Sequence, residues 1–286
     1  MKNQEKNNTI KIATWNVNSI RARIPRVIEW VKEESPDILL LQELKCTEDQ
    51  FPFLEFASFN YNIEMVCEKA RNGVAILSKF PLYDVKKALP LYDIVEKDES
   101  ARYIEAYFDC NGKTVKIASI YLPNGAPTAL EERNGYSDIT ETETFYNKMK
   151  FCDRLRLHFQ EHIKNNEIAI FGGDYNVCPV LEMDVYSTKK DGSITNTYKE
   201  RGKFKSFLDV GMVDVWRKLN PNLREYSWWG YRPIFMWEKN QGYRLDALLT
   251  TEKASELINY CKIYSKETRG KEKASDHAPM MCELAL

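Results

Sequence analysis

Short apolar runs recur along the whole chain and alternate with longer amphipathic stretches, and this alternation limits the folds available. The runs that we expect to form strands are residues 10–15, 38–42, 74–77, 103–108, 115–121, 168–171, 245–249 and 280–284. The stretches with helical spacing are residues 24–33, 145–164 and 199–210. Asn111 and Gly112 are typical of a tight hairpin turn between two of the strands. Many strands with few helices between them predict two sheets packed face to face, with helices outside.

The length and composition fit one folded domain. The chain has 286 residues and contains no internal repeat, low-complexity segment or Gly/Ser linker, so we predict a single domain over residues 10–286. Residues 1–9 are polar and are expected to form a disordered tail. No apolar run approaches the roughly 20 residues that cross a bilayer, and the N-terminus has no apolar signal segment. Seven scattered cysteines without a CxxC pair predict reduced thiols and a cytoplasmic protein.

Five polar clusters follow the apolar runs, where side chains from several strand ends can meet on one rim of a sandwich. They occupy residues 15–18, 41–43, 121–125, 172–176, and a late pair at 244–246 and 275–277. Taken singly, each has a simpler explanation, because Asn, Asp and Gly after a strand are common turn formers. Glu43 is different, since it follows the apolar run 38–41 and a carboxylate leaving the core requires a partner or a metal.

The residue types in these clusters indicate one kind of chemistry. The group predicted to hold or surround a metal offers mainly oxygen ligands, which suit Mg²⁺ or Mn²⁺ better than zinc. Asp246 next to the His277 imidazole can fix its tautomer, leaving the other ring nitrogen to donate to an oxyanion. Hydrolysis of a phosphodiester needs a metal, an activated water and such donors. The predicted metal group is Glu43, Asn16, Asp276, Asp174, Asn176 and His277.

Eight stretches in order resemble the exonuclease III branch of the endonuclease/exonuclease/phosphatase fold, which contains the class II apurinic/apyrimidinic endonucleases. The resemblance covers residues 10–286, and its stretches are 14–23, 36–45, 121–125, 173–177, 184–186, 226–232, 242–246 and 275–279. It implies a four-layered α/β sandwich of two mixed sheets flanked by helices. It also implies hydrolysis of DNA phosphodiesters with one or two bound metal ions.

The resemblance further implies roles for individual residues. Glu43 would bind the catalytic metal with Asn16 and Asp276 near it, and Asp174 would orient or deprotonate the attacking water. Asn176 would hold Asp174 or the phosphate. Donors to phosphate oxygens would be Tyr121 and His277, with Asp246 behind His277, and the phosphate pocket would also include Asn18 and Asn124.

The implied substrate is double-stranded DNA with abasic sites or blocked 3′ ends. Trp228 and Tyr243 would wall the pocket for an extrahelical baseless sugar, with Tyr231 beside them; buried core aromatics are the simpler alternative. The net charge of −1 does not by itself indicate a nucleic-acid-binding protein. Phosphate contacts would therefore come from local basic groups. They are Arg21, Arg23, Lys45, Arg71, Arg102 and Arg232.

The chain departs from the family pattern in a few places. Ser100 and Ala101 precede Arg102 where the family has an acidic residue and a glycine, and Tyr243 stands where the family usually has Trp. Pro127 replaces an arginine that some members wedge into DNA. The loop over 128–144 is long and acidic, so contacts to the DNA can differ.

His158 and His162 are the other two of three histidines in the chain. They are four residues apart on an expected helix, a spacing that can bind zinc. The sequence offers no third ligand nearby, and a zinc site is therefore not predicted there.

The leading hypothesis is a Mg²⁺-dependent DNA-repair nuclease that incises 5′ to abasic sites and also has 3′–5′ exonuclease and 3′-phosphatase or phosphodiesterase activity. We expect a monomer, cytoplasmic and nucleoid-associated if the source is bacterial. Two alternatives are a phosphoesterase of the same fold acting on a lipid or inositol phosphate, and a catalytically silent DNA binder.

Overall fold

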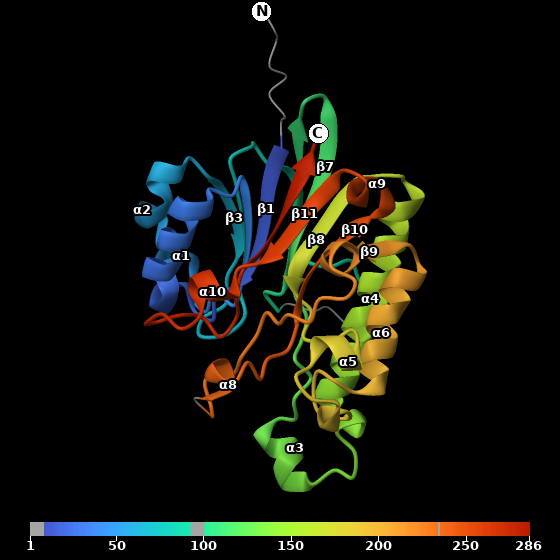
Figure 1. The fold of residues 1–286 in the computed structure, drawn as a ribbon. Helices are drawn as coiled ribbons and strands as arrows, with labels where there is room; N and C mark the ends of the chain where they lie inside the picture. Colours follow the sequence, from blue (N-terminus) through green and yellow to red (C-terminus); the bar gives the residue numbers. More distant parts are fainter. Residues whose placement is uncertain (1–8, 93–99, 234) are drawn as a thin grey trace, which may run out of the picture.

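Two six-stranded mixed sheets form the centre of the protein, whose computed structural model describes residues 9–92, 100–233 and 235–286 (Figure 1). The strand orders are β11-β12-β1-β2-β4-β3 and β5-β6-β7-β8-β10-β9. The first sheet contains β1 (Thr9–Asn16), β2 (Ile38–Gln42), β3 (Asn62–Val66), β4 (Val74–Ser78), β11 (Ile258–Ile263) and β12 (Met280–Ala285). The second contains β5 (Tyr83–Lys86), β6 (Tyr103–Cys110), β7 (Lys113–Tyr121), β8 (Ile168–Asp174), β9 (Met212–Asp214) and β10 (Asp246–Thr251).

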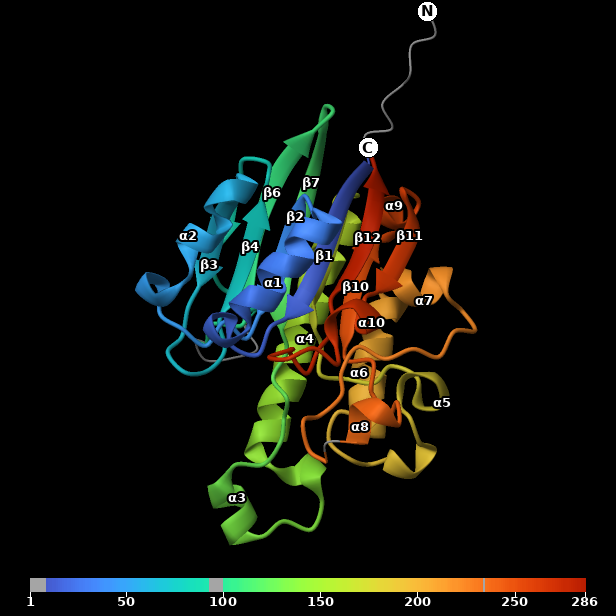
Figure 2. The ribbon, with the colours of Figure 1, turned by 60° about the vertical axis from the view of Figure 1, so that its left-hand side comes forward.

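Helices cover the outer faces of the two sheets. Figures 1 and 2 show α1 (Ile20–Glu34), α2 (Phe53–Phe56) and α10 (Ser265–Thr268) on the first sheet and α4 (Glu143–Lys164) with α6 (Tyr198–Asp209) on the second. Shorter helices lie in the connections: α3 (Ala129–Asn134), α5 (Leu181–Asp184), α7 (Val215–Leu219), α8 (Phe235–Glu238) and α9 (Glu252–Ser255). Of the helices in the described part of the chain, none combines the length and apolar character needed to cross a bilayer.

The alternation of side chains along β2 shows why the sheets stack in four layers. Ile38 and Leu40 point between the sheets and pack in one core with Ile170 of β8. Leu39 and Leu41 point to the opposite face and pack in a second core with side chains of α1. Both faces of the strand are therefore buried, which explains its uninterrupted apolar sequence. The predicted four-layered α/β sandwich is confirmed.

Several predicted boundaries need correction. Helix α1 begins at Ile20 rather than at residue 24, so Pro25 lies inside the helix. Proline removes one backbone donor and is tolerated there at the cost of one helical hydrogen bond. The predicted loop over 128–144 contains helix α3. Of the predicted tail, residues 1–8 lie outside the described part of the chain, and Thr9 is already the first residue of β1.

Two glycines at the end of β8 let the strand approach its neighbours closely. A Cβ added at Gly173 would lie 2.0 Å from the carbonyl oxygen of Ile120 on β7. A Cβ at Gly172 would lie 2.6 Å from Leu40 Cδ1 in the opposite sheet. The glycines thus allow close packing directly before Asp174.

Replacing Gly173 with Ala should lower the free energy of unfolding by about 1–3 kcal/mol, because the new methyl group meets backbone rather than a movable side chain. Urea unfolding of the two proteins measures this difference. Gly202→Ala is the matched control, since Gly202 lies in helix α6 with no atom within 4 Å of the added Cβ. That variant should gain about 0.5–1 kcal/mol. Equal effects of the two substitutions would contradict the packing argument.

Candidate active site

Strand register places three of the predicted polar residues side by side in the second sheet. Tyr121, the last residue of β7, pairs with Asp174 at the end of β8. Asp174 in turn pairs with Asp246 at the start of β10. Paired residues on neighbouring strands project on the same side of a sheet. A phenol and two carboxylates therefore meet at one end of the sandwich, opposite the described termini.

The first sheet supplies its residues through two linked loops. Asn16 pairs with Gln42 at the ends of β1 and β2. The chain then turns sharply, and Glu43 adopts a left-handed backbone conformation with φ of 55°. The Ser19 backbone N–H donates to the Glu43 carbonyl over 2.8 Å and joins the two loops. Such conformations cost free energy in non-glycine residues and cluster at functional sites.

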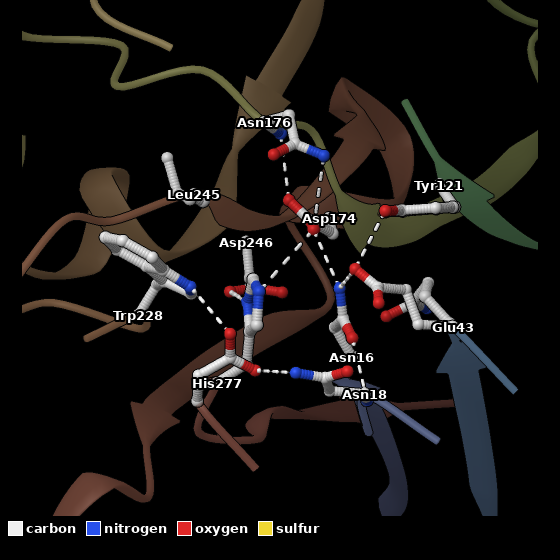
Figure 3. A network of polar contacts seen from close by, with 12 residues as sticks. Asn16, Asn18, Glu43, Tyr121, Asp174, Asn176, Trp228, Leu245, Asp246 and His277 are labelled. Carbon is white, nitrogen blue, oxygen red and sulfur yellow. Dashed lines mark hydrogen bonds and ion pairs between the residues drawn. The ribbon is translucent and has the colours of Figure 1, made fainter. Parts of the chain in front are cut away.

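The carboxylates of Glu43, Asp174 and Asp276 line one cavity of about 550 Å³, although they are far apart in the sequence. Figure 3 shows the side chains converging from strands of both sheets. The other residues around the cavity are Asn18, Lys45, Tyr121, Asn124, Asn176, Lys190, Ser193, Ile194, Thr195, Trp228, Tyr243, Leu245 and His277.

Asp174 occupies a buried position at the centre of this network. Its Oδ2 accepts hydrogen bonds from the side-chain amides of Asn16 (2.9 Å) and Asn176 (3.3 Å). Burial raises the pKa of Asp174 to about 7, with the nearby Asp246 and Glu43 adding to the rise and His277 opposing it. A carboxyl group with a pKa near neutrality suits a general base.

His277 lies between two carboxylates. Its Nδ1 is 2.8 Å from Asp246 Oδ2, and its Nε2 is 3.6 Å from Asp174 Oδ2. Burial alone would lower the pKa of His277, but the charges of Asp246 and Asp174 outweigh it and raise the pKa to about 10. The ring is therefore protonated at neutral pH and can donate from Nε2 into the cavity.

Glu43 is held by three donors. Its Oε1 accepts from the Asn16 amide (3.0 Å) and the Tyr121 hydroxyl (2.8 Å), and its Oε2 lies 2.5 Å from the Lys45 ammonium. Burial opposes ionisation, but the bonds from Asn16 and Lys45 outweigh it and lower the pKa of Glu43. Burial and Glu43 keep the pKa of Tyr121 well above its usual value, so the phenol remains a donor.

Asp276 lies between an amide and an indole. Asn18 Nδ2 donates to its Oδ1 over 3.0 Å, and Trp228 Nε1 donates to its Oδ2 over 3.1 Å. Burial acts against ionisation, but the charge of His277 and these two donors lower the pKa of Asp276. The Trp228 indole is thus fixed by a carboxylate of the cavity.

The side-chain oxygens near Glu43 are suitable ligands for a hard divalent cation. The Lys45 ammonium already lies between Glu43 Oε2 and Asn18 Oδ1, the latter 2.7 Å away, which shows that these oxygens converge on positive charge. Asp174, Asp246 and His277 also have ligand atoms within 4.8 Å of one another. In this structure Nδ1 of His277 faces Asp246 and Nε2 faces Asp174, an arrangement that suits a hydrogen-bond donor.

Hydrogen bonds from the side-chain amides of Asn16 and Asn176 hold the carboxylates of the site in position. The Asn16 side chain donates to Glu43 and Asp174 while its Oδ1 accepts from the Asn18 backbone N–H (3.0 Å). Asn176 accepts from the Asn124 amide over 3.0 Å. These contacts support positioning roles better than direct ligation.

Trp228 and Tyr243 both line the cavity, with ring centroids 5.3 Å apart. Tyr231 and Arg23 do not; they line a neighbouring pocket of about 390 Å³, where Arg23 Nη2 donates to the Tyr231 hydroxyl over 2.9 Å. Tyr186 packs edge-on against Tyr243. The aromatic residues predicted as one patch thus belong to two adjoining hollows.

The remaining predicted basic residues are less concentrated. The Arg102 guanidinium lies over the Tyr121 ring, 4.7 Å from its centroid, and so supports a cavity residue from outside. Arg71 pairs with Glu68, and its side chain is 79% exposed. Arg21 and Arg232 are exposed outside the cavity.

The sequence interpretation missed several residues that line or support the cavity. Lys190 and Ser193 line the cavity from the segment between α5 and α6. Lys148 of α4 is buried and donates to the backbone carbonyls of Asn124 (2.9 Å) and Asn176 (2.8 Å). None of these residues follows an apolar run, which was the signal used to find the others.

Comparisons with known proteins agree with this geometry. Residues 13–277 match the model of the endonuclease/exonuclease/phosphatase family. The chain is 28% identical to exodeoxyribonuclease III of Haemophilus influenzae, over 96% of this chain and 100% of that protein. It is 33% identical to the solved structure of an AP endonuclease from Archaeoglobus fulgidus, with a TM-score of 0.85 over 97% of this chain and 100% of that one.

A third relative adds a related activity. The 3′–5′ exonuclease NExo from Neisseria meningitidis is 29% identical and has a TM-score of 0.85 over 97% of this chain and 100% of that one. The chain therefore belongs to the endonuclease/exonuclease/phosphatase family, in the branch of DNA-repair nucleases that includes exonuclease III and AP endonucleases.

Proposed function

We propose that this protein is a Mg²⁺- or Mn²⁺-dependent nuclease that incises the phosphodiester 5′ to abasic sites. We also assign it 3′–5′ exonuclease and 3′-phosphatase or phosphodiesterase activity. The observation that carries the proposal is the shared cavity, in which Asp174, with a pKa of about 7, faces the Nε2 of His277. Glu43 and Asp276 line the same cavity and supply the oxygen ligands.

The residues of the cavity have different roles in the proposed hydrolysis. A bound divalent cation would neutralise negative charge on the phosphate, and Glu43 with Asp276 would hold it. Asp174 orients the attacking water and accepts its proton, while Asn16 and Asn176 fix the carboxylate.

Two donors face the phosphate oxygens in this proposal. His277, oriented by Asp246, donates from Nε2. The Tyr121 hydroxyl, which donates to Glu43 Oε1 in this structure, would turn to a phosphate oxygen when substrate binds. Such preorganised donors stabilise the charge that develops on phosphorus in the transition state. Asn18 and Asn124 complete the phosphate pocket as neutral side chains.

The proposed substrate is double-stranded DNA with an abasic site or a blocked 3′ end. Trp228, Tyr243 and Leu245 would form the wall against a baseless sugar turned out of the helix. Basic side chains around the cavity would contact DNA phosphates and make affinity salt-dependent. The solved structure of the Neisseria 3′ phosphatase NExo bound to a product DNA hairpin, 29% identical to this chain, supports DNA as the ligand. A single domain and a cytoplasmic monomer remain predictions.

Metal removal tests the proposal. The purified protein is treated with EDTA and assayed on a duplex carrying one abasic analogue and on a duplex with a 3′-phosphate end. We expect no product with EDTA, and full recovery of incision 5′ to the analogue when excess Mg²⁺ is added. Recovery by Mn²⁺ but not Ca²⁺ would agree with a small octahedral site.

Parallel assays separate the alternatives. Faster release of phosphate from a phospholipid or an inositol phosphate than from DNA would assign the chain to the lipid-directed class. DNA binding without any EDTA-sensitive cleavage would identify a silent binder. Either result contradicts the proposed nuclease.

A further inference from the structure

A second cluster of titratable side chains lies in the interior, apart from the active-site cavity. Glu105 on β6 meets His158 and His162 on α4. His158 Nε2 is 2.6 Å from Glu105 Oε2 and 3.0 Å from His162 Nε2. The relative exposures of the three residues are 0%, 2% and 5%. Three ligand atoms thus converge on one point without contact with bulk water.

The outer nitrogens of both imidazoles have oxygen partners. His162 Nδ1 lies 2.6 Å from Glu167 Oε2. His158 Nδ1 lies 2.8 Å from the Tyr92 hydroxyl, whose own proton is donated to Glu161 Oε2 over 2.6 Å. Both Nδ1 atoms therefore act as donors. Metal-bound histidines in proteins characteristically donate their second N–H in this way.

With both Nδ1 atoms protonated, the remaining nitrogen and oxygen atoms of the cluster favour a cation. A neutral imidazole that is protonated at Nδ1 carries a lone pair at Nε2. The Nε2 atoms of His158 and His162 face each other, with the Glu105 carboxylate beside them. Electron pairs at these distances repel one another unless a proton or a metal ion lies between them.

We propose that Glu105, His158 and His162 form a binding site for a divalent transition-metal ion, with Zn²⁺ the best match. Two imidazoles and one carboxylate are a zinc ligand set, whereas Mg²⁺ takes oxygen ligands. A tetrahedral zinc ion separates its ligand atoms by roughly 3.3 Å. The present separations of 2.6 and 3.0 Å approach this value.

The surroundings of Glu105 are compatible with the site. Lys116 donates to Glu105 Oε1 over 2.8 Å, which leaves Oε2 on the histidine side for the ion. The Tyr103 hydroxyl hydrogen-bonds to Oε2. It or a water molecule can take the fourth position. The sequence interpretation found no third ligand because Glu105 lies on a distant strand, and the structure brings this carboxylate to the two histidines.

Occupancy would link the outer helical layer to the second sheet, because Glu105 belongs to β6 and both histidines to α4. The same helix carries Lys148, which holds the backbone carbonyls of Asn124 and Asn176. Ten residues separate Lys148 from His158, or roughly 15 Å along the helix. The inferred ion would therefore stabilise the element that positions two residues of the active-site cavity, independently of the nuclease proposal.

Nitrogen NMR of the imidazoles gives a direct test, because the chain has three histidines. Untagged, ¹⁵N-histidine-labelled protein is stripped with a chelator, dialysed and titrated with Zn²⁺ in the presence of saturating Mg²⁺. We expect one equivalent of Zn²⁺ to shift the Nε2 signals of His158 and His162 and to leave those of His277 unchanged. At zinc well above its dissociation constant, the melting temperature should rise by roughly 5 °C or more.

Amino-acid substitutions test which residues bind the zinc ion. His162→Gln keeps a group that can hydrogen-bond to Glu167 but removes one ligand, so zinc affinity should fall at least tenfold. Glu43→Gln changes the proposed magnesium site and should retain zinc binding at His158 and His162. Co²⁺ in place of Zn²⁺ should give visible absorption without thiolate charge-transfer bands, which excludes the seven cysteines as ligands.

Two results would contradict the metal site without bearing on the proposed nuclease activity. Unshifted His158 and His162 signals at excess Zn²⁺ would show that the cluster is only a hydrogen-bonded network, as would unchanged affinity in His162→Gln. Either result overturns the metal site and leaves the nuclease assays, which depend on Mg²⁺ and Asp174, unaffected.

Discussion

Replacing Asp174 with Asn should lower the kcat for incision at an abasic site by about 10³-fold or more. An amide has nearly the same shape as the carboxylate but cannot accept the proton of the attacking water. General base catalysis typically contributes 10²- to 10⁴-fold, and Asp174 is also the central acceptor for Asn16 and Asn176. Single-turnover cleavage of a duplex with one abasic analogue measures the loss.

The same variant should bind DNA about as well as the wild type, because the wall of Trp228 and Tyr243 and the surrounding basic side chains are unchanged. Fluorescence anisotropy at fixed salt measures this affinity. Asp153→Asn is the matched control, since Asp153 lies on α4 and pairs with Lys203 outside the cavity. It should keep activity within about twofold. Wild-type cleavage by the Asp174 variant would remove the proposed general base.

The buried central strands of the two sheets could be predicted from the sequence, whereas the edge strands could not. Strands β2, β8 and β12 are nearly or fully apolar on both faces, and runs of this kind were predicted close to their observed bounds. The four strands that were missed are β3, β5, β9 and β11, and each is the outermost strand of its sheet. Edge strands pack on one side only and carry polar residues, so they lack a continuous apolar signal.

The active site was predictable to the extent that its residues follow such runs. Asn16, Glu43, Tyr121 and Asp174 come at or just after strand ends, and strand register brings them together. The individual roles of these residues were not predictable, because each role depends on which atoms face one another. For example, nothing in the sequence indicated that Lys45, which is expected to contact DNA, would also pair with Glu43.

Buried ion pairs formed the other gap in the prediction. Lys148 and Glu200 are both fully buried and pair across α4 and α6. In the sequence each looks like an ordinary charged position on an amphipathic helix, and charge pairing across two helices has no local signature. Arg244 is the clearest case, because it entered the prediction only as part of the polar cluster at 244–246.

Arg244 is fully buried and connects two carboxylates behind the active site. Its Nε donates to Asp184 Oδ1 over 2.7 Å, and its Nη2 lies 2.8 Å from Asp214 Oδ2. Asp184, whose side chain is also fully buried, accepts a further bond from Arg217 over 2.6 Å. The guanidinium therefore offsets charge that water cannot reach.

Arg244→Met should lower the free energy of unfolding by about 3–5 kcal/mol, because methionine fills much of the space but leaves Asp214 and part of Asp184 without a countercharge. Urea unfolding measures the loss. Lys205→Met is the control, since Lys205 pairs with Asp209 on the exposed face of α6, where both side chains are more than half exposed, and should change stability by less than about 1 kcal/mol. Equal effects of the two variants would mean that the pocket readmits water. A large loss confined to Arg244→Met would instead show that the buried charge cluster of Arg244, Asp184 and Asp214 stabilises the fold.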